Sequence, residues 1–203
     1  MTTLEHRPAT ATPTSTVPTP APRTAPTPTT PASVPATRFP VVTRAARYVL
    51  AGLRIALGWI FLWAFLDKLF GLGHETTEKA AWINGGQPTK GFLANATAGP
   101  FADIYRDLAG ATWADWLFML GLAGVGVALI SGIGLRIAAA AGGLLMVLMW
   151  TAVLPPENNL FLDDHLIYAG LLVVLALLNT GDTIGLGRFW GRTALVRALP
   201  WLK

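Results

Sequence analysis

The chain has 203 residues, of which 53% are hydrophobic and 13% are charged, and its formal net charge is +4 at pH 7. Soluble globular domains carry about 25% charged residues. The charge deficit and a mean hydropathy of +0.50 therefore indicate a membrane protein. The absence of cysteine excludes disulfides, thiolate metal ligands and Cys-x-x-Cys redox chemistry. No basic face interleaved with aromatic residues indicates binding to nucleic acid.

The first 43 residues differ in composition from the rest of the chain. Proline, threonine and alanine dominate them, and large apolar side chains are few. Such a segment cannot bury enough surface to offset the entropy that it would lose on ordering. We therefore predict that residues 1–43 form a disordered, partly polyproline-like cytoplasmic tail.

Four apolar segments follow the tail, and their lengths suit transmembrane helices. About 20 residues of helix cross a hydrocarbon core about 30 Å thick, whereas β-barrel strands would be shorter and would alternate in polarity. The segments are residues 48–70, 113–133, 135–154 and 163–180. We predict an all-α membrane protein, with a bundle of four transmembrane helices in a membrane domain over residues 44–190.

The placement of basic residues predicts the orientation of this bundle. Arginines precede the first segment and lie in the short turn before the third, and a basic C-terminal segment, residues 191–203, follows the fourth. The connection 155–162 has neither lysine nor arginine. Because positive charge favours the cytoplasmic side, we predict that both termini are cytoplasmic. The long connection before residue 113 should then lie outside, as short interfacial pieces over the mouth of the bundle.

Three titratable residues, Asp163, Asp164 and His165, stand at the start of the last apolar segment. One carboxylate can cap a helix, but a cap does not require two carboxylates and a histidine. Ionisable residues at membrane depth are candidates for function. We predict that His165 and Asp164 transfer protons, and capping alone stays open as the alternative. The scattered positions of His6, His74 and His165 predict no dedicated metal site.

Other polar and aromatic residues are expected at the same membrane level as His165. Asp67 and Lys68 lie near the end of the first segment, and Trp150 lies near the end of the third. We predict that Asp67, Lys68 and Trp150 line a substrate pocket on the outer face, together with His165. The cavity would lie where the packed helices bring these levels together.

Arg54 lies nearer the opposite end of the first segment. We expect its long side chain to reach along the helix to the membrane surface. Pairing with Asp182 across the bundle is the alternative.

Three stretches resemble the DoxX/DoxD family: "RIALGWIFLWAFLDKL", "GGQPTKGFLANATAGPFA" and "LPPENNLFLDDHLIYAGLLVVLALLNTGDTIGL". The resemblance covers about residues 44–190 and implies a four-helix protein of the bacterial cytoplasmic membrane. In that family, DoxD-type members are associated with thiosulfate:quinone oxidoreductase. DoxX-type members are associated with membrane oxidoreductase complexes that respond to oxidative and thiol stress.

Two classes of function follow from the resemblance. The first is a quinone-reactive redox subunit without a covalent cofactor, in which His165 and Asp164 move protons and Lys68 holds an anionic sulfur substrate or a semiquinone. The second is a non-catalytic membrane anchor for soluble redox or stress enzymes. In either class the expected partners are the lipid bilayer and either a second membrane subunit or soluble redox enzymes.

Overall fold

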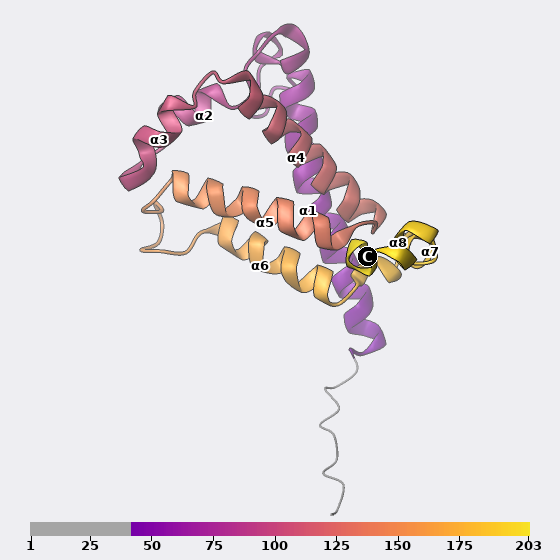
Figure 1. Cartoon of the computed structure of the whole chain (residues 1–203). Helices are drawn as coiled ribbons and strands as arrows, with labels where there is room; N and C mark the ends of the chain where they lie inside the picture. Colours follow the sequence, from indigo (N-terminus) through magenta and orange to yellow (C-terminus); the bar gives the residue numbers. More distant parts are fainter. Residues whose placement is uncertain (1–41) are drawn as a thin grey trace, which may run out of the picture. The chain divides into compact units, whose positions relative to one another are not determined.

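The structure, a computed structural model, describes residues 42–203 (Figure 1). The predicted disordered tail over residues 1–43 lies outside the described residues, apart from Val42 and Thr43. Within residues 42–203 the chain is all-helical and contains no strand. One isolated parallel bridge joins Ala98 to Val153. The all-α prediction is therefore confirmed for this part of the chain.

Three helices are long and apolar enough to cross a membrane: α1 (Arg44–Phe70), α4 (Thr112–Ser131) and α5 (Leu135–Ala152). The fourth apolar helix, α6 (Asp164–Leu177), has only 14 residues. At 1.5 Å per residue it is about 21 Å long, less than the ~30 Å of a hydrocarbon core. The predicted fourth span over residues 163–180 is therefore not confirmed by helix length. The helix stops early because Asn179 adopts a left-handed conformation, with φ 46°.

Local sequence signals set the ends of the long helices. The Thr43 side chain caps α1 by accepting a hydrogen bond from the N–H of Ala46 at 3.2 Å. Gly132 ends α4 with φ 76°, and Gly134 precedes α5 with φ 62°. Both conformations favour glycine, so the chain reverses direction within a few residues. The predicted tight turn between the second and third apolar segments is confirmed.

The helices pack mainly as two pairs, α1 with α4 and α5 with α6, and contacts between α4 and α5 join the pairs. Close approach within the first pair depends on Gly126 of α4. A Cβ atom on Gly126 would lie 2.8 Å from the backbone nitrogen of Leu62 in α1. Small residues allow such contact where lipid supplies no hydrophobic force between helices.

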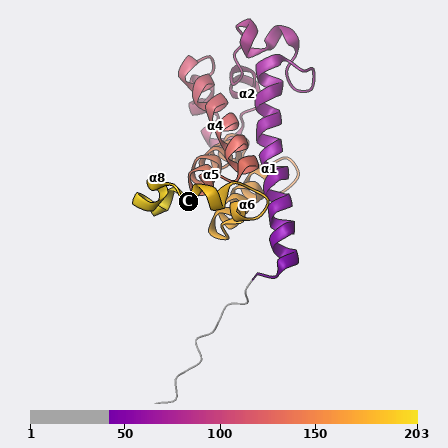
Figure 2. The ribbon, with the colours of Figure 1, turned by 90° about the vertical axis from the view of Figure 1, so that its right-hand side faces the viewer.

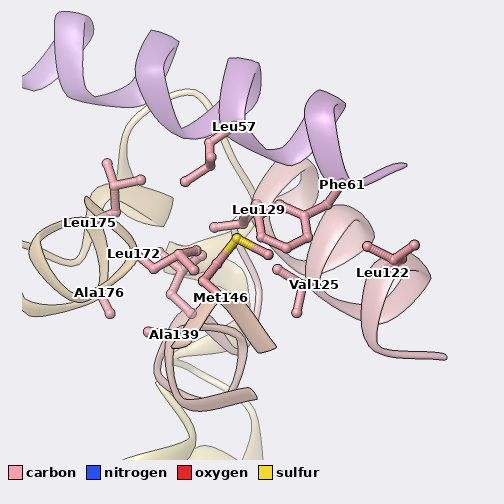
Figure 3. Packing of buried hydrophobic residues seen from close by; sticks show 11 residues of the cluster. Leu57, Phe61, Leu122, Val125, Leu129, Ala139, Met146, Leu172, Leu175 and Ala176 are labelled. Atoms are coloured by element: carbon pink, nitrogen blue, oxygen red, sulfur yellow. The ribbon is translucent and has the colours of Figure 1, made fainter. Parts of the chain in front are cut away.

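A single apolar cluster holds the four helices together (Figure 3). Each helix contributes side chains to this cluster, and Met146 of α5 lies among leucines from the other helices. The members labelled in Figure 3 are Leu57, Phe61, Leu122, Val125, Leu129, Ala139, Met146, Leu172, Leu175 and Ala176. The cluster fixes the relative positions of the helix ends, where the polar groups lie.

The connection between α1 and α4 folds into short helices. They are η1 (Glu78–Ala80), η2 (Trp82–Asn84), α2 (Lys90–Asn95), η3 (Gly99–Phe101) and α3 (Ala102–Asp107). We call the end of the bundle that carries this connection and residues 153–163 the loop end. The opposite side, which carries the first half of α1 and the C-terminus, is the terminal end. Figure 2 shows the C-terminus beside α1, above its first turns.

Buried and partly buried hydrogen bonds attach the connection to the bundle at the loop end. The carboxylate of Asp115 in α4 accepts bonds from the backbone N–H and the hydroxyl of Thr89, at 2.9 and 2.7 Å. The hydroxyl of Tyr105 in α3 lies 2.6 Å from that of Thr151 in α5. These bonds bring the connection across both helix pairs, as the predicted interfacial pieces over the bundle mouth would require.

Arg54 lies at the terminal end and is fully buried, with 0% of its surface exposed. Its Nη1 donates to the carbonyl of Leu129 at 2.6 Å, and its Nη2 donates to that of Ile184 at 2.6 Å. The expectation that Arg54 reaches the membrane surface is therefore wrong. The hydrogen bonds within residues 42–203 join Arg54 to backbone carbonyls and not to Asp182, whose Oδ2 binds Lys203 instead. The negative end of α4 favours the guanidinium at this position.

Candidate functional site

Asp67, near the end of α1, is the centre of a buried polar turn. Its carboxylate is 2% exposed and accepts backbone hydrogen bonds from His74, Glu75 and Thr76, at 3.3, 3.0 and 2.9 Å. The chain can bend back to make these bonds because Gly71 ends α1 in the left-handed conformation. Asp67 thus fixes the position of residues 74–76 against α1.

The turn places His74 over an aromatic face of α1. The His74 ring packs edge-on to Trp63, with 5.2 Å between ring centroids and 74° between planes. Trp63 in turn contacts Trp59 at 5.8 Å. Trp59, Trp63 and Asp67 are spaced four residues apart, so they follow one face of the helix.

This face forms an open groove of about 680 Å³, which we call the α1 groove. Its lining is aromatic and apolar along α1 and polar at the loop end. The residues are Trp59, Ile60, Trp63, Ala64, Asp67, His74 and Glu75. Trp59 is 51% exposed and Ile60 46% exposed. Both residues belong to a helix long enough to span a membrane, so this face of the groove is suited to contact with lipid.

Lys68 stands beside the α1 groove rather than in its lining. Its Nζ donates to Glu75 Oε2 at 2.8 Å. The Lys68 side chain is largely covered, whereas that of Glu75 is exposed. Lys68 therefore contacts the groove lining only through its ion pair with Glu75, and the two opposite charges are close enough to offset each other.

A second polar group surrounds the start of α6. Asp163 is the N-cap, and its Oδ1 accepts from the N–H of Leu166 at 3.3 Å. Its Oδ2 lies 2.7 Å from His165 Nδ1, and Asp164 Oδ1 lies 3.5 Å from the same nitrogen. An ionised Asp163 favours the proton on Nδ1, which leaves Nε2 of a neutral His165 as an acceptor. One aspartate therefore both caps the helix and orients the histidine.

Trp150 belongs with this second group. Its Nε1 donates to the carbonyl of Phe161 at 2.9 Å. The two rings pack edge to face, with centroids 5.2 Å apart. Phe161 comes two residues before the capping Asp163, so Trp150 anchors the α5–α6 connection next to His165.

The five predicted site residues thus fall into two sets. Asp67 and Lys68 share the turn at the end of α1, while Trp150, Asp164 and His165 gather where α5 and α6 meet at the loop end. Among the described residues, Asp164 contacts His165 directly, Asp67 and Lys68 both bind Glu75, and Trp150 binds Phe161. Within this part of the chain, no hydrogen bond, ion pair or ring contact of these residues joins the first set to the second. A single cavity shared by all five stays a prediction.

Sequence reasoning missed His74, which it treated only as an isolated histidine. The available signal was the spacing of Trp59, Trp63 and Asp67 along one helical face, followed by a histidine within reach. The turn that brings His74 back to that face depends on hydrogen bonds that the spacing does not encode.

Asp163, Asp164 and His165 offer ligand atoms within 4.8 Å of one another, as a cation site would need. Asp163 already binds a backbone N–H and the imidazole, so its oxygens are engaged. Asp164 is largely exposed. We therefore assign this group to capping and to the orientation of His165.

The fold and its polar ends define an all-helical integral membrane protein in which most connecting residues fold at one end of the bundle. The chain belongs to the DoxX family, whose family model matches residues 49–155. The match covers most of α1, with the whole lining of the α1 groove, and all of α4 and α5, and it ends before Asp163 and His165. No curated protein matches the chain. No solved structure matches it either.

Proposed function

We propose that the protein is a DoxX-type membrane subunit of a redox system and that a quinone binds in the α1 groove. The observation that carries the proposal is the position of His74, held by Asp67 against Trp63 in a groove suited to contact with lipid. A quinone is a flat, lipid-soluble ring with two carbonyl oxygens. Trp59 and Trp63 offer ring faces for it, and imidazole can donate to a carbonyl oxygen and supply a proton.

The chain's own residues would handle the protons of this reaction. Reduction of a quinone to a quinol takes up two electrons and two protons, and the chain contains no cysteine to serve as a thiol donor. The electrons would come from a partner enzyme. His165 and Asp164 are proposed as a second proton-transfer group, and Lys68 as the residue that attracts an anionic reductant. None of these three side chains lines the α1 groove.

We also propose four membrane passes with both termini in the cytoplasm. The support is the distribution of charge: Arg44, Arg47 and Arg136 lie at the terminal end with the basic C-terminal segment. The short α6 would cross by including its capped start and local thinning of the bilayer. Cysteines introduced at Gly91 and Asn158 should react with an impermeant maleimide from outside, and one at Ala194 should not. The reverse labelling pattern would refute the orientation.

A non-catalytic anchor is the second candidate. The α1–α4 connection exposes Ile83 and Ile104, which are 59% and 62% exposed, and these could contact a partner protein. Mass spectrometry of proteins that copurify in mild detergent distinguishes the candidates. A stoichiometric partner without bound quinone would favour the anchor.

The test of quinone binding compares two histidines and two tryptophans. The protein would be purified in mild detergent from quinone-containing membranes, and the quinone per protein would be measured in lipid extracts. We expect His74→Gln and Trp63→Leu each to reduce bound quinone about tenfold. This factor corresponds to about 1.4 kcal/mol, the contribution of one hydrogen bond or ring contact. The matched controls His165→Gln and Trp113→Leu should retain it. Equal losses in the variants and controls, or wild-type protein without quinone, would refute the proposal.

A further inference from the structure

The C-terminal segment, Gly187–Lys203, is an ordered part of the bundle. It contains α7 (Gly187–Trp190), α8 (Ala194–Ala198) and η5 (Pro200–Leu202). The Trp190 indole donates to the carbonyl of Leu202 at 2.9 Å, and Lys203 Nζ binds Asp182 Oδ2 at 3.0 Å. These contacts close the segment on itself and tie its end to η4 (Thr180–Asp182). The predicted basic C-terminal segment, residues 191–203, therefore belongs to a folded unit with a defined surface.

That surface combines apolar and basic side chains. Val196 and Leu202 are buried toward the bundle. The exposed apolar side chains are those of Phe189, Leu195, Leu199 and Trp201. Arg188, Arg192 and Arg197, which alternate with them along the sequence, are also exposed. Residues 187–203 contain neither aspartate nor glutamate, so the face carries positive charge with no acidic residue of its own to offset it.

The position of the segment puts this face at the membrane boundary. Arg136, in the first turn of the spanning helix α5, donates to the carbonyl of Pro200 at 3.4 Å. The segment therefore lies level with the terminal end of a transmembrane helix, and Figure 2 shows α8 projecting from the side of the bundle there. A protein partner would have to cover scattered apolar residues on three short helices. A lipid surface accepts them at the boundary of headgroups and acyl chains.

We propose that Gly187–Lys203 lies on the membrane surface and binds anionic phospholipid headgroups. Arg188, Arg192 and Arg197 pair with lipid phosphates, for which the planar guanidinium is well suited. Phe189, Leu195 and Trp201 insert between headgroups. The membrane surface thus also binds the C-terminal segment at the terminal end. This binding does not depend on a ligand in the α1 groove.

The test uses the full-length protein in nanodiscs and exploits the absence of native cysteine. A spin label would be attached at Ala198→Cys, an exposed small residue of α8. Its accessibility to oxygen, which concentrates in lipid, and to a neutral nickel complex, which stays in water, reports its depth. The nanodiscs would contain phosphatidylcholine alone or phosphatidylcholine mixed with phosphatidylglycerol. We expect the label to move into the lipid boundary in the mixture, and raised salt should partly reverse the shift.

A charge-matched pair of double variants separates specific binding from net charge. Each basic residue near an anionic membrane contributes about 1 kcal/mol, so Arg192→Gln with Arg197→Gln should weaken docking about 25-fold. Lys79→Gln with Lys90→Gln removes the same charge from the loop end and should leave the label unchanged. Equal nickel accessibility in both lipid mixtures would overturn the proposal. Protection of the label from nickel that appears only in native membranes would also overturn it, because that result indicates a protein partner. An equal loss of protection in the two double variants would overturn it as well.

Discussion

Two regions at the loop end each join an aspartate to a histidine, but they use different bonds. At the end of α1, Asp67 accepts the backbone N–H of His74, and the imidazole ring packs against Trp63. At the start of α6, Asp163 binds the imidazole of His165 itself, 2.7 Å from Oδ2 to Nδ1. Asp67 therefore determines where its histidine lies, whereas Asp163 determines which nitrogen of its histidine carries a proton.

The difference in burial explains how an aspartate–histidine pair can have a structural role in one region and a role in proton exchange in the other. Asp67 is buried, and three backbone groups depend on it, so its loss should disturb the fold. The Asp163 and His165 side chains are 13% and 23% exposed and keep access to water. A partly exposed, paired imidazole is better placed to exchange protons than a buried carboxylate satisfied by backbone donors.

We expect the largest loss of unfolding free energy from a mutation of Arg54 at the terminal end, larger than from mutations of Asp67 or Asp163. Arg54→Met would leave the buried carbonyl of Leu129 and the partly buried carbonyl of Ile184 without their donor. We expect a loss of about 4 kcal/mol, or roughly 10 °C in the melting temperature of the detergent-solubilised protein. Arg197→Met, an exposed control, should melt like the wild type. A melting temperature unchanged by Arg54→Met would show that the carbonyl bonds contribute little.

Asp67→Asn should cause a smaller loss of stability than Arg54→Met, but a larger loss than the same change at an exposed aspartate. Asp67→Asn keeps one acceptor oxygen but loses the second, which binds the N–H groups of Glu75 and Thr76. We expect a cost of about 2 to 3 kcal/mol, from thermal unfolding, because charge-assisted bonds to backbone are lost. Bound quinone should fall as His74 shifts. Asp103→Asn removes the same charge from an exposed position, and an equal effect there would contradict the role of Asp67.

Asp163 should behave in the opposite way, with little change in stability and a larger change in function. Asparagine caps helices about as well as aspartate, so Asp163→Asn should cost roughly 0.5 kcal/mol or less. His165 Nδ1 would lose its carboxylate partner, and turnover of the complex should fall about tenfold without loss of bound quinone. Destabilisation as large as that of Asp67→Asn would mean that the two aspartates do not differ as proposed.

The smallest stability effect is expected at Lys68. Its partner Glu75 is largely exposed, and such ion pairs contribute about 0.5 kcal/mol. Lys68→Met should therefore leave unfolding nearly unchanged while raising the apparent KM for an anionic reductant. Lys90→Met, at an exposed position of the same connection, provides the control. A KM unaffected by Lys68→Met would remove Lys68 from the proposed site.

Much of the helical framework could be predicted from apolar runs and their boundary residues. The segments 48–70, 113–133 and 135–154 correspond to α1, α4 and α5 within a few residues, because glycines at 71, 132 and 134 mark their ends. The fourth segment was placed too long at both ends. Hydropathy continues past Leu177, whereas the helix stops where Asn179 turns left-handed.

The polar contacts could be predicted only in part. That either Asp163 or Asp164 caps a helix follows from their place before an apolar run, and the structure shows that Asp163 is the cap. The burial of Asp67 and Arg54 could not be read from the sequence. The partners of Asp67 lie on residues 74–76, and those of Arg54 lie on the end of α4 and on residues 183–184. The contacts of these groups depend on how the connecting segments fold back against α1. The position of His74 depends on the same folding.

Photoaffinity labelling with an azido-substituted quinone tests the central claim, that the α1 groove binds a quinone, most directly. The protein would be labelled in native membranes, with and without excess unmodified quinone, and the modified peptides would be mapped by mass spectrometry. Our account predicts labels between Trp59 and Glu75 that the excess quinone prevents. Labels confined to Trp150 and the start of α6, or labels that the competitor does not reduce, would contradict it.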